Sequence, residues 1–429
     1  MVNFARSFYY LATLLRRAYW DSERLERYQN KRLRELTRYA YDFVPFYHKQ
    51  FRKLGLKPSD IKTKKDLNKL PIIQKDLIRE NLNDMISVEF DVKDLKRLST
   101  SGSTGKPLFL YINAAESEFR KAKHLRANLS CGQKPRDKWV TITAPHHFGE
   151  SSGLQKILGV FAPTPLSVFT EPDKQIEIIR KLNPDILEGY SSSLFILAKE
   201  FEKNDAFKPR VVFGGAELVD SYSRQYIEKV FGTKFIDQYA SVEMERIAWQ
   251  CPVAEEYHID ADALVLQFVD KNGEEVSPGE KGEIVCTSLF SYSMPFIRYA
   301  IGDLAVPSDG LCSCGRCLPL MKSIEGRKDS LLVLPNGRTL TPRAFTICMN
   351  MFKYYNCIDQ FRVIQREQDF FEFNIALKAS TINENVLERE LVTHLSRVLN
   401  LNQVSFNIRF VKAISLEKTG KLMAVVSKL

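Results

Sequence analysis

The sequence predicts an α/β protein with a large, multi-subdomain N-terminal domain and a small α+β C-terminal domain. Three observations lead to this prediction. At 429 residues the chain exceeds the size at which a single hydrophobic core stops growing. Its middle alternates short β-rich runs with helical ones, which is typical of parallel βαβ units. Residues 330–429 contain β-rich runs and a helical stretch of their own, enough for a separate domain.

Helices are expected first. In residues 1–60, leucines recur near helical spacing among charged residues. The apolar run at 8–15 could be mistaken for the core of a secretion signal. However, Arg16 and Arg17 follow it at once and no small-residue cleavage site is present, so we interpret it as an amphipathic helix. No run approaches the roughly 18 apolar residues that a membrane helix requires.

Parallel βαβ units are expected next, from residue 98 to about 240. Strand-like runs alternate with helical ones such as 173–182. Ligands tend to collect at the carboxyl ends of parallel strands. Two stretches, FGGAE at 213–217 and DQYASVE at 237–243, fall at such ends.

A β-rich part is expected from 260 to 305, because strand-like segments follow one another there with a turn at Asn272-Gly273, a pattern that is typical of antiparallel strands. The C-terminal domain then contains strand-like runs at 361–377 and 404–411, with a helix from about Glu384 between them.

The surplus of positive charge is local. Of the formal net charge of +10, residues 1–60 contribute a surplus of seven, with 13 Lys/Arg against 6 Asp/Glu. A solvated helix face explains it, and a patch for anionic lipid, nucleic acid or an acidic carrier protein is the alternative. Because no nucleic-acid motif accompanies it, we expect no nucleic-acid partner. Weak association with an anionic membrane surface stays open.

The loop LSTSGSTGKPL at 98–108 has the composition of a phosphate-binding loop. Its glycines allow successive backbone N–H groups and hydroxyls to converge on an anion, and Lys106 adds a positive charge. It is not a Walker loop, because Thr100 and Pro107 stand where that pattern needs a glycine and a Ser or Thr. Taken alone, the composition also fits a plain surface loop.

The string STSGSTGKP at 99–107 resembles the phosphate loop of the adenylate-forming enzymes, which include acyl-CoA synthetases, aryl-CoA ligases and adenylation domains. Further stretches resemble that family's other signatures in the right order: FGGAE, DQYASVE, RYAIGD at 298–303 with EGRKD at 325–329, and EKTGK at 417–421. The length and cysteine pattern are similar to the branch that holds phenylacetate-CoA ligase and its CapK-type relatives in capsular polysaccharide biosynthesis. The resemblance covers about residues 40–429.

The resemblance implies a site for ATP and Mg²⁺. Glu243 matches the magnesium-binding glutamate, and a hard cation that bridges phosphates needs such a carboxylate. Asp303 matches the carboxylate that holds both ribose hydroxyls. The cofactor-binding residues that the resemblance implies are Ser101, Gly102, Ser103, Thr104, Gly105 and Lys106 in the phosphate loop, Gly214, Gly215, Ala216 and Glu217 near the adenine, and Tyr239, Asp303 and Arg327.

Two further roles follow from the resemblance. Lys421 aligns with the lysine that bridges the carboxylate and the α-phosphate, so Lys421 and Glu243 are the expected catalytic residues. Asp329 matches the hinge about which a mobile C-terminal lid rotates between the half-reactions. The implied domains are 1–328, divided into 1–97, 98–250 and 251–328, and a lid of 329–429. The motifs depart from the family at Ala240 and Val242, where glycine and a hydroxyl residue are usual.

The cysteines suggest a metal site. Eight cysteines in so long a chain are no disulfide scaffold, and their clustering favours metal in a reducing compartment, so we expect a cytoplasmic protein. Cys251, His258 and the cluster Cys312, Cys314 and Cys317 suit structural Zn²⁺, with free thiols as the alternative. Spacing leaves Cys314 and Cys317 open as the last ligand, and the resemblance favours Cys251, His258, Cys312 and Cys314.

The expected function is therefore an AMP-forming ligase that activates a small carboxylic acid with ATP and passes the acyl group to an acceptor, by default coenzyme A. One alternative is an amide or ester synthase in capsule or cell-surface polysaccharide biosynthesis. Another is a nucleotide-binding scaffold without turnover, which Ala240 and Val242 suggest. The acid and the acceptor are not specified by any motif.

Overall fold

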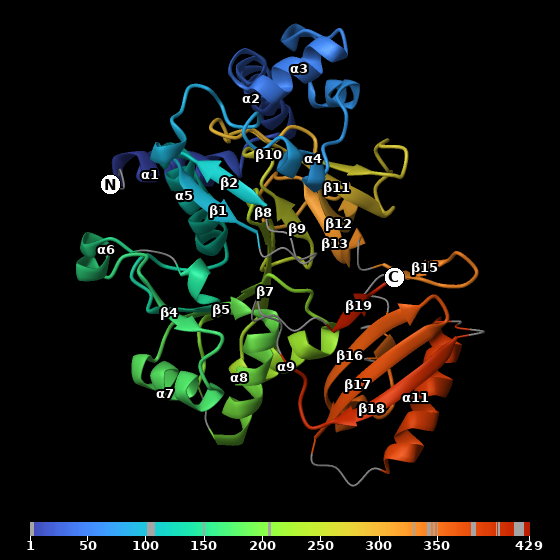
Figure 1. Cartoon of the computed structure of the whole chain (residues 1–429). Helices are drawn as coiled ribbons and strands as arrows, with labels where there is room; N and C mark the ends of the chain where they lie inside the picture. The colour runs from blue at the N-terminus through green and yellow to red at the C-terminus, as the bar shows by residue number, and fades with distance from the viewer. Residues whose placement is uncertain are drawn as a thin grey trace. The chain divides into compact units, whose positions relative to one another are not determined.

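The computed structural model confirms the predicted α/β fold class, with parallel and antiparallel strands in its larger sheet and a separate four-stranded sheet (Figure 1). It describes residues 4–100, 108–148, 151–204, 207–328, 331–340, 345, 348–349, 351–378, 383–399, 401, 404–415 and 424–429. The chain divides into two compact units: Met1–Pro135 with Ile236–Ile324, and Arg136–Phe235 with Glu325–Leu429. The domain boundary between residues 328 and 329 stays a prediction.

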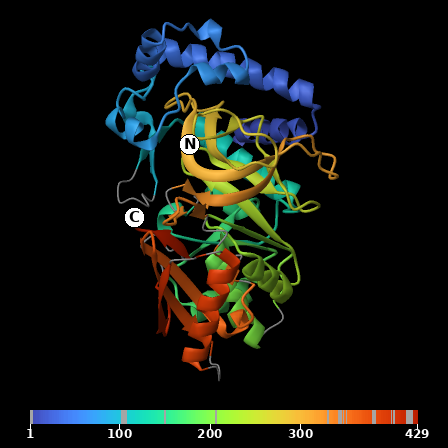
Figure 2. The ribbon, with the colours of Figure 1, turned by 90° about the vertical axis from the view of Figure 1, so that its right-hand side faces the viewer.

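The first unit opens with the expected helices α1 (Phe4–Arg17), α2 (Ser22–Phe43) and α3 (Pro45–Lys53). Asp21 caps α2, since its carboxylate accepts a hydrogen bond from the backbone N–H of Arg24 at 2.8 Å. Pro45 starts α3 at the position where a missing N–H costs nothing. The amide of Gln29 donates to the carbonyls of Ala261 and Leu264, both at 2.9 Å, so α2 is fastened across the strands of this unit (Figure 2).

Short elements lead from these helices to the proposed phosphate loop: η1 (Pro58–Asp60), η2 (Lys64–Lys69), α4 (Lys75–Glu80), η3 (Val92–Asp94) and β1 (Lys96–Ser99). After the loop come β2 (Phe109–Ile112) and the helix α5 (Ala114–Ser130). Strands β1 and β2 pair antiparallel. Beyond them, Thr100 and Leu108 exchange two hydrogen bonds of 3.0 Å, which tie the two ends of the loop together.

The strands of the first unit follow the order β10-β11-β12-β13-β9-β8-β7. Their bounds are β7 (Phe235–Ser241), β8 (Glu245–Gln250), β9 (Tyr257–Ile259), β10 (Leu264–Val269), β11 (Gly282–Ser288), β12 (Tyr299–Ser308) and β13 (Leu320–Arg327). Strand β11 pairs antiparallel with both β10 and β12, which confirms the predicted β-rich part. The turn at Asn272-Gly273 is also present, and Gly273 adopts φ +83°.

The second unit contains the predicted parallel strands, in the order β6-β5-β3-β4. The elements of this segment are β3 (Trp139–Thr143), η4 (Pro145–His147), α6 (Gly153–Leu158), β4 (Pro163–Ser167), α7 (Pro172–Leu182), β5 (Ile186–Tyr190), α8 (Ser191–Asn204), β6 (Val211–Gly215) and α9 (Ser221–Phe231). Val140, Leu187 and Val212 of three neighbouring strands are almost fully buried in one core with Phe201 and Phe231 of the helices.

The C-terminal segment of the second unit builds the smaller sheet, in the order β18-β17-β16-β19. Its elements are β14 (Leu332–Val333), β15 (Thr339–Leu340), η6 (Tyr355–Cys357), β16 (Ile358–Glu367), β17 (Phe370–Leu377), α11 (Glu384–Leu399), β18 (Ser405–Val411) and β19 (Val425–Ser427). Leucines at 387, 391, 395 and 399 of α11 are buried because a four-residue spacing keeps them on one helix face. The expected α+β unit is thus confirmed as a local fold.

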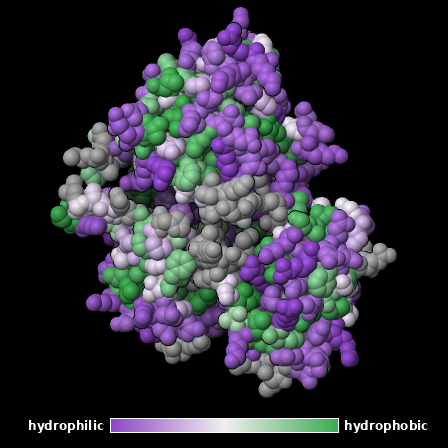
Figure 3. Space-filling view, viewed as in Figure 1, coloured by the Kyte–Doolittle hydropathy of each residue, from purple (hydrophilic) through white to green (hydrophobic). Residues whose placement is uncertain are grey.

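No described helix is both long and apolar enough to cross a membrane. Hydrophilic side chains gather over the N-terminal helices α2 and α3 on the face shown in Figure 3. This distribution is consistent with a solvated face for much of the basic N-terminal segment.

Candidate nucleotide site and metal centre

Tyr239 and Asp303 form a hydrogen-bonded pair. Tyr239 lies on the buried strand β7, and Asp303 lies on β12. The Tyr239 hydroxyl donates to Asp303 Oδ2 at 2.6 Å. Asp303 is half-buried, so one carboxylate oxygen is fixed by the tyrosine while the group keeps access to solvent. A carboxylate held in this way is suited to accept hydrogen bonds from a pair of vicinal hydroxyls.

Glu243 is held by a hydroxyl and an ammonium group. Its side chain is almost fully buried, and the hydroxyl of Tyr299 donates to Glu243 Oε1 at 2.8 Å. Lys75 Nζ, on α4, lies 3.5 Å from the same oxygen. A buried carboxylate needs such partners to stay charged. Glu243 therefore offers a preorganised anionic oxygen ligand, and Lys75 supplies the positive charge that balances it.

Helix α5 fixes the backbone around Glu243. Arg120 donates to the carbonyls of Val242 at 2.8 Å and Glu243 at 2.5 Å, while Lys123 donates to the carbonyl of Met244 at 2.7 Å. Burial lowers the pKa of Lys123 to about 8. Three successive carbonyls are thus satisfied by one helix, which restricts the backbone that carries the Glu243 carboxylate.

The FGGAE stretch lies at the end of β6 in the second unit. A Cβ on Gly214 would lie only 1.8 Å from Cζ of Phe235, so packing against that ring requires glycine here. Ala216 adopts φ +66°, which is uncommon for a residue with a side chain. Glu217 Oε2 accepts a hydrogen bond from the backbone N–H of Ser192 at 2.9 Å, at the start of α8. The stretch is therefore a constrained turn between a strand and a helix.

The predicted nucleotide residues are distributed between the described and undescribed parts of the chain. Tyr239, Glu243 and Asp303 belong to the first unit. Residues 214–217 and Arg327, a half-buried residue at the end of β13, belong to the second. The remaining predicted residues lie outside the described residues: Ser101, Gly102, Ser103, Thr104, Gly105, Lys106, Asp329 and Lys421.

Four predicted metal ligands converge in the first unit. The ligand atoms of Cys251, His258, Cys312 and Cys314 all lie within 4.8 Å of one another. Cys312 Sγ lies 3.5 Å from Cys251 Sγ, and Cys314 Sγ lies 3.3 Å from His258 Nε2. Cys317 is not a member of this group. Three thiols and one imidazole with no carboxylate fit structural zinc, for which a closed tetrahedral set is typical.

Neighbouring strands explain why the four residues meet. His258 lies on β9, which pairs with β8, and Cys251 follows the end of β8. The backbone N–H of Cys251 donates to the carbonyl of Glu256 at 3.0 Å and closes the turn between these strands. Cys251 and His258 are buried, whereas Cys312 and Cys314 are half-buried on the segment before β13.

Sequence reasoning did not single out Lys75, Tyr299, Arg120 or Lys123 as neighbours of Glu243. Lys75 is 168 positions from Glu243 along the chain, and nothing in the sequence around a helical lysine indicates its distant partner. Tyr299 lies inside the RYAIGD signature, four residues before Asp303, so that signature could have pointed to it.

Comparison with known proteins adds evidence of relationship. No protein-family profile matches the chain. The phenylacetate-coenzyme A ligase of Escherichia coli is 25% identical over 421 residues, which cover 94% of each chain. That of Thermus thermophilus is 26% identical over 323 residues, 73% of this chain and 72% of the relative. Over most of its length the chain is thus similar in sequence to phenylacetate-coenzyme A ligases.

Two further proteins are similar to the chain, one in sequence and one in structure. Protein CapK of Staphylococcus aureus is 26% identical over 305 residues, 64% of this chain and 61% of CapK. The structure of 2-hydroxyisobutyryl-CoA ligase in its postadenylation state has a TM-score of 0.82 at 21% identity and covers 96% of this chain and 91% of that one. The chain thus has the fold of that ligase, and its sequence relatives include phenylacetate-CoA ligases and CapK.

Proposed function

We propose that the protein is an ATP-dependent ligase that activates a carboxylic acid as an acyl-adenylate and then transfers the acyl group to an acceptor. A carboxylate oxygen attacks the α-phosphorus of ATP, the bond to the departing pyrophosphate breaks, and acyl-adenylate forms. The acceptor then attacks the acyl carbonyl, and AMP leaves with the oxygen that came from the acid. By default the acceptor is the thiol of coenzyme A.

The Tyr239–Asp303 pair is the observation that carries this proposal. Its fixed carboxylate belongs to the segment that resembles the family's ribose motif, and the chain is similar to proteins named as coenzyme A ligases. We assign ribose binding to Asp303 and charge stabilisation at the reacting carboxylate and α-phosphate to Lys421. Positioning and charge stabilisation supply most of the catalysis in such a reaction.

We further propose that Glu243 provides an oxygen ligand for Mg²⁺ on the triphosphate. A buried carboxylate with partners already in place is a suitable ligand for a hard cation. For the remaining nucleotide contacts we retain the phosphate loop at 101–106, residues 214–217 and Arg327. The structural Zn²⁺ is assigned to Cys251, His258, Cys312 and Cys314. Thiolate ligands favour a reducing, cytoplasmic setting.

A second candidate function shares the first half-reaction. The similarity to CapK favours an amide or ester synthase for a cell-surface polysaccharide precursor, with an amine, sugar hydroxyl or carrier protein as the acceptor. The basic N-terminal segment would fit weak association with an anionic membrane surface in that setting.

ATP–pyrophosphate exchange tests the proposal. The purified chain is assayed with Mg²⁺ and a panel of aryl, fatty, hydroxy and amino acids. We expect exchange that depends on one class of acid. Thioester formation with coenzyme A then supports the first candidate, whereas exchange without thioester supports the second. No exchange over the whole panel, together with measurable ATP binding, would contradict adenylation and favour the scaffold that Ala240 and Val242 suggested.

A further inference from the structure

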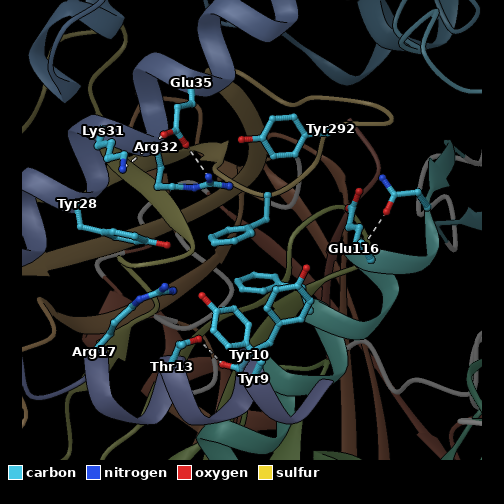
Figure 4. A pocket seen from close by; sticks show the side chains of 14 residues that line it. Tyr9, Tyr10, Thr13, Arg17, Tyr28, Lys31, Arg32, Glu35, Glu116 and Tyr292 are labelled. Atoms are coloured by element: carbon cyan, nitrogen blue, oxygen red, sulfur yellow. Dashed lines mark hydrogen bonds and ion pairs between the residues drawn. The ribbon is translucent and has the colours of Figure 1, made fainter. Parts of the chain in front are cut away.

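The first unit contains a cavity of about 370 Å³ that lies outside every predicted motif (Figure 4). It is open to solvent on one side and lined by residues of α1, α2 and α5, by Asn113 just before α5, and by the segment 290–292 after β11. None of its lining residues belongs to the nucleotide motifs or the cysteine group. The volume lies within the range of about 300–1,000 Å³ that is usual for small-molecule sites.

Aromatic rings form much of its wall. Phe119 of α5 and Phe290 stack with ring centroids 3.7 Å apart and planes at 12°. Tyr10 of α1 packs edge-on against Phe119 with a centroid distance of 5.4 Å. Tyr9, Tyr28 and Tyr292 complete the aromatic part of the lining. Such walls favour a ligand with a flat ring, because offset and edge-on ring contacts add to simple burial.

The cavity also contains the positive charge of Arg17, which forms no ion pair with a carboxylate of the described residues. Arg17 lies over the Tyr28 ring, 4.3 Å from the guanidinium carbon to the ring centroid. Within the part of the chain that the structure describes, no carboxylate pairs with Arg17 and its guanidinium donates no hydrogen bond. In Figure 4 the Arg17 and Tyr28 side chains both extend into the cavity.

The acidic residues of the lining are already engaged. Glu35 accepts from Arg32 at 2.6 Å and lies 4.0 Å from Lys31. Glu116 pairs with Arg120 at 3.2 Å and accepts from Ser291 at 2.9 Å. An anion that enters the cavity would therefore meet Arg17 without having to displace a carboxylate. A buried or half-buried cation gains most when such a partner arrives.

We propose that this cavity binds a small anionic ligand that carries a flat ring, with Arg17 and the Tyr28 hydroxyl as donors to its anionic group. A mononucleotide and an aryl carboxylate share this chemistry. The site is distinct from the proposed nucleotide site, and its occupancy does not depend on adenylation. Because α5 lines the cavity with Phe119 and holds the Glu243 carbonyl through Arg120, a ligand here contacts the helix that positions the proposed magnesium ligand.

Equilibrium binding of AMP and of benzoate tests the proposal. Each probe is titrated against the full chain carrying Arg17→Gln, with Arg16→Gln as the matched control, since Arg16 is an exposed neighbour on α1 that does not line the cavity. The titrations are repeated in the Asp303→Ala background, which weakens the proposed nucleotide site. Thermal unfolding of all variants reports whether they are folded.

We expect at least one probe to show one binding site fewer per chain in Arg17→Gln than in Arg16→Gln, in both backgrounds. Loss for AMP alone identifies a nucleotide ligand, and loss for benzoate alone an aryl carboxylate. Tyr28→Phe, which keeps the ring and removes the hydroxyl, should weaken the same site about tenfold and serves if Arg17→Gln fails to fold. Equal stoichiometry and affinity in the two arginine variants for both probes would overturn the proposal.

Discussion

Two tyrosine hydroxyls fix the carboxylates of the proposed nucleotide site. Tyr239 donates to Asp303, and Tyr299 donates to Glu243, each over a distance typical of a hydrogen bond to a charged group. Neither tyrosine need react. Each sets the direction of a carboxylate before a ligand arrives, which lowers the ordering cost of binding.

Tyr239→Phe should raise the KM for ATP about tenfold while leaving the KM for the acid unchanged. A hydrogen bond to a charged group contributes about 1.5–3 kcal/mol, and its loss would free the Asp303 carboxylate to rotate. Steady-state exchange kinetics with each substrate varied in turn measure the effect. Tyr257→Phe is the control, because Tyr257 makes the same kind of bond to Asp237. An unchanged KM for ATP in Tyr239→Phe would argue against ribose binding at Asp303.

Lys421→Ala should lower ATP–pyrophosphate exchange by about 100- to 1,000-fold. Removal of one group that stabilises charge in a transition state has effects of this size. Lys418→Ala provides a neighbouring control and should retain activity. Exchange by Lys421→Ala at the rate of Lys418→Ala would remove Lys421 from the role assigned to it.

The proposed metal centre would join two separate segments of the first unit. β8 and β9 position Cys251 and His258, and the segment before β13 returns with Cys312 and Cys314. A metal there would cross-link residues that lie more than 50 positions apart. Its free energy of binding would therefore contribute to the stability of the first unit.

The protein purified without chelator should contain about one zinc per chain. Cys312→Ser should lose the metal, and its midpoint of thermal unfolding should fall by more than about 5 °C. Cys317→Ser should retain the metal and the wild-type midpoint. Elemental analysis and calorimetry provide the measurements. If the wild type contains no metal, the cysteines are free thiols. If both variants lose the metal equally, the ligand set differs from the proposed one.

Regular elements were predictable where the sequence has a clear period. Strands β3, β5 and β6 are short apolar runs between amphipathic helices, and α11 repeats leucine every four residues. Strand β8 was not predicted. Its sequence ERIAWQ includes the buried Arg246, which is placed there by a hydrogen bond to His124 that no local pattern encodes.

The site residues that could be predicted were likewise those that lie in a clear local sequence pattern. The local signatures contain Tyr239, Glu243 and Asp303, which all lie in the first unit. The cysteine spacing left Cys314 and Cys317 open as the last ligand, and the four residues that the resemblance favoured do converge. The cavity around Arg17 was not predicted, because its lining comes from three helices and a loop that meet only in the folded chain.

At the scale of the whole molecule, we propose that the C-terminal lid takes one arrangement about Asp329 for adenylation and another for acyl transfer. Within the second unit, the C-terminal segment contacts the helices of the parallel sheet: Tyr222 and Tyr355 pack edge-on at 4.8 Å, and Lys199 donates to the carbonyl of Asp359 at 2.9 Å. These small polar and aromatic contacts are compatible with a segment that docks and releases.

Asp329→Pro should spare acyl-adenylate formation and slow acyl transfer by at least about tenfold, because proline fixes φ at the proposed hinge. Single-turnover assays that follow pyrophosphate release and acceptor acylation separately measure the two steps. Asp329→Ala keeps the backbone free and should transfer at a nearly normal rate. Equal damage to both steps in Asp329→Pro would count against a hinge.

The central claim is that a carboxylate oxygen becomes bonded to the α-phosphorus of ATP. The most direct test follows that oxygen. The acid that supports exchange is labelled with ¹⁸O in its carboxylate and turned over with ATP, Mg²⁺ and the acceptor, and the products are analysed by mass spectrometry. The account predicts one ¹⁸O in AMP and none in inorganic phosphate or pyrophosphate. Label in inorganic phosphate, accompanied by ADP, would show activation through an acyl phosphate and contradict it.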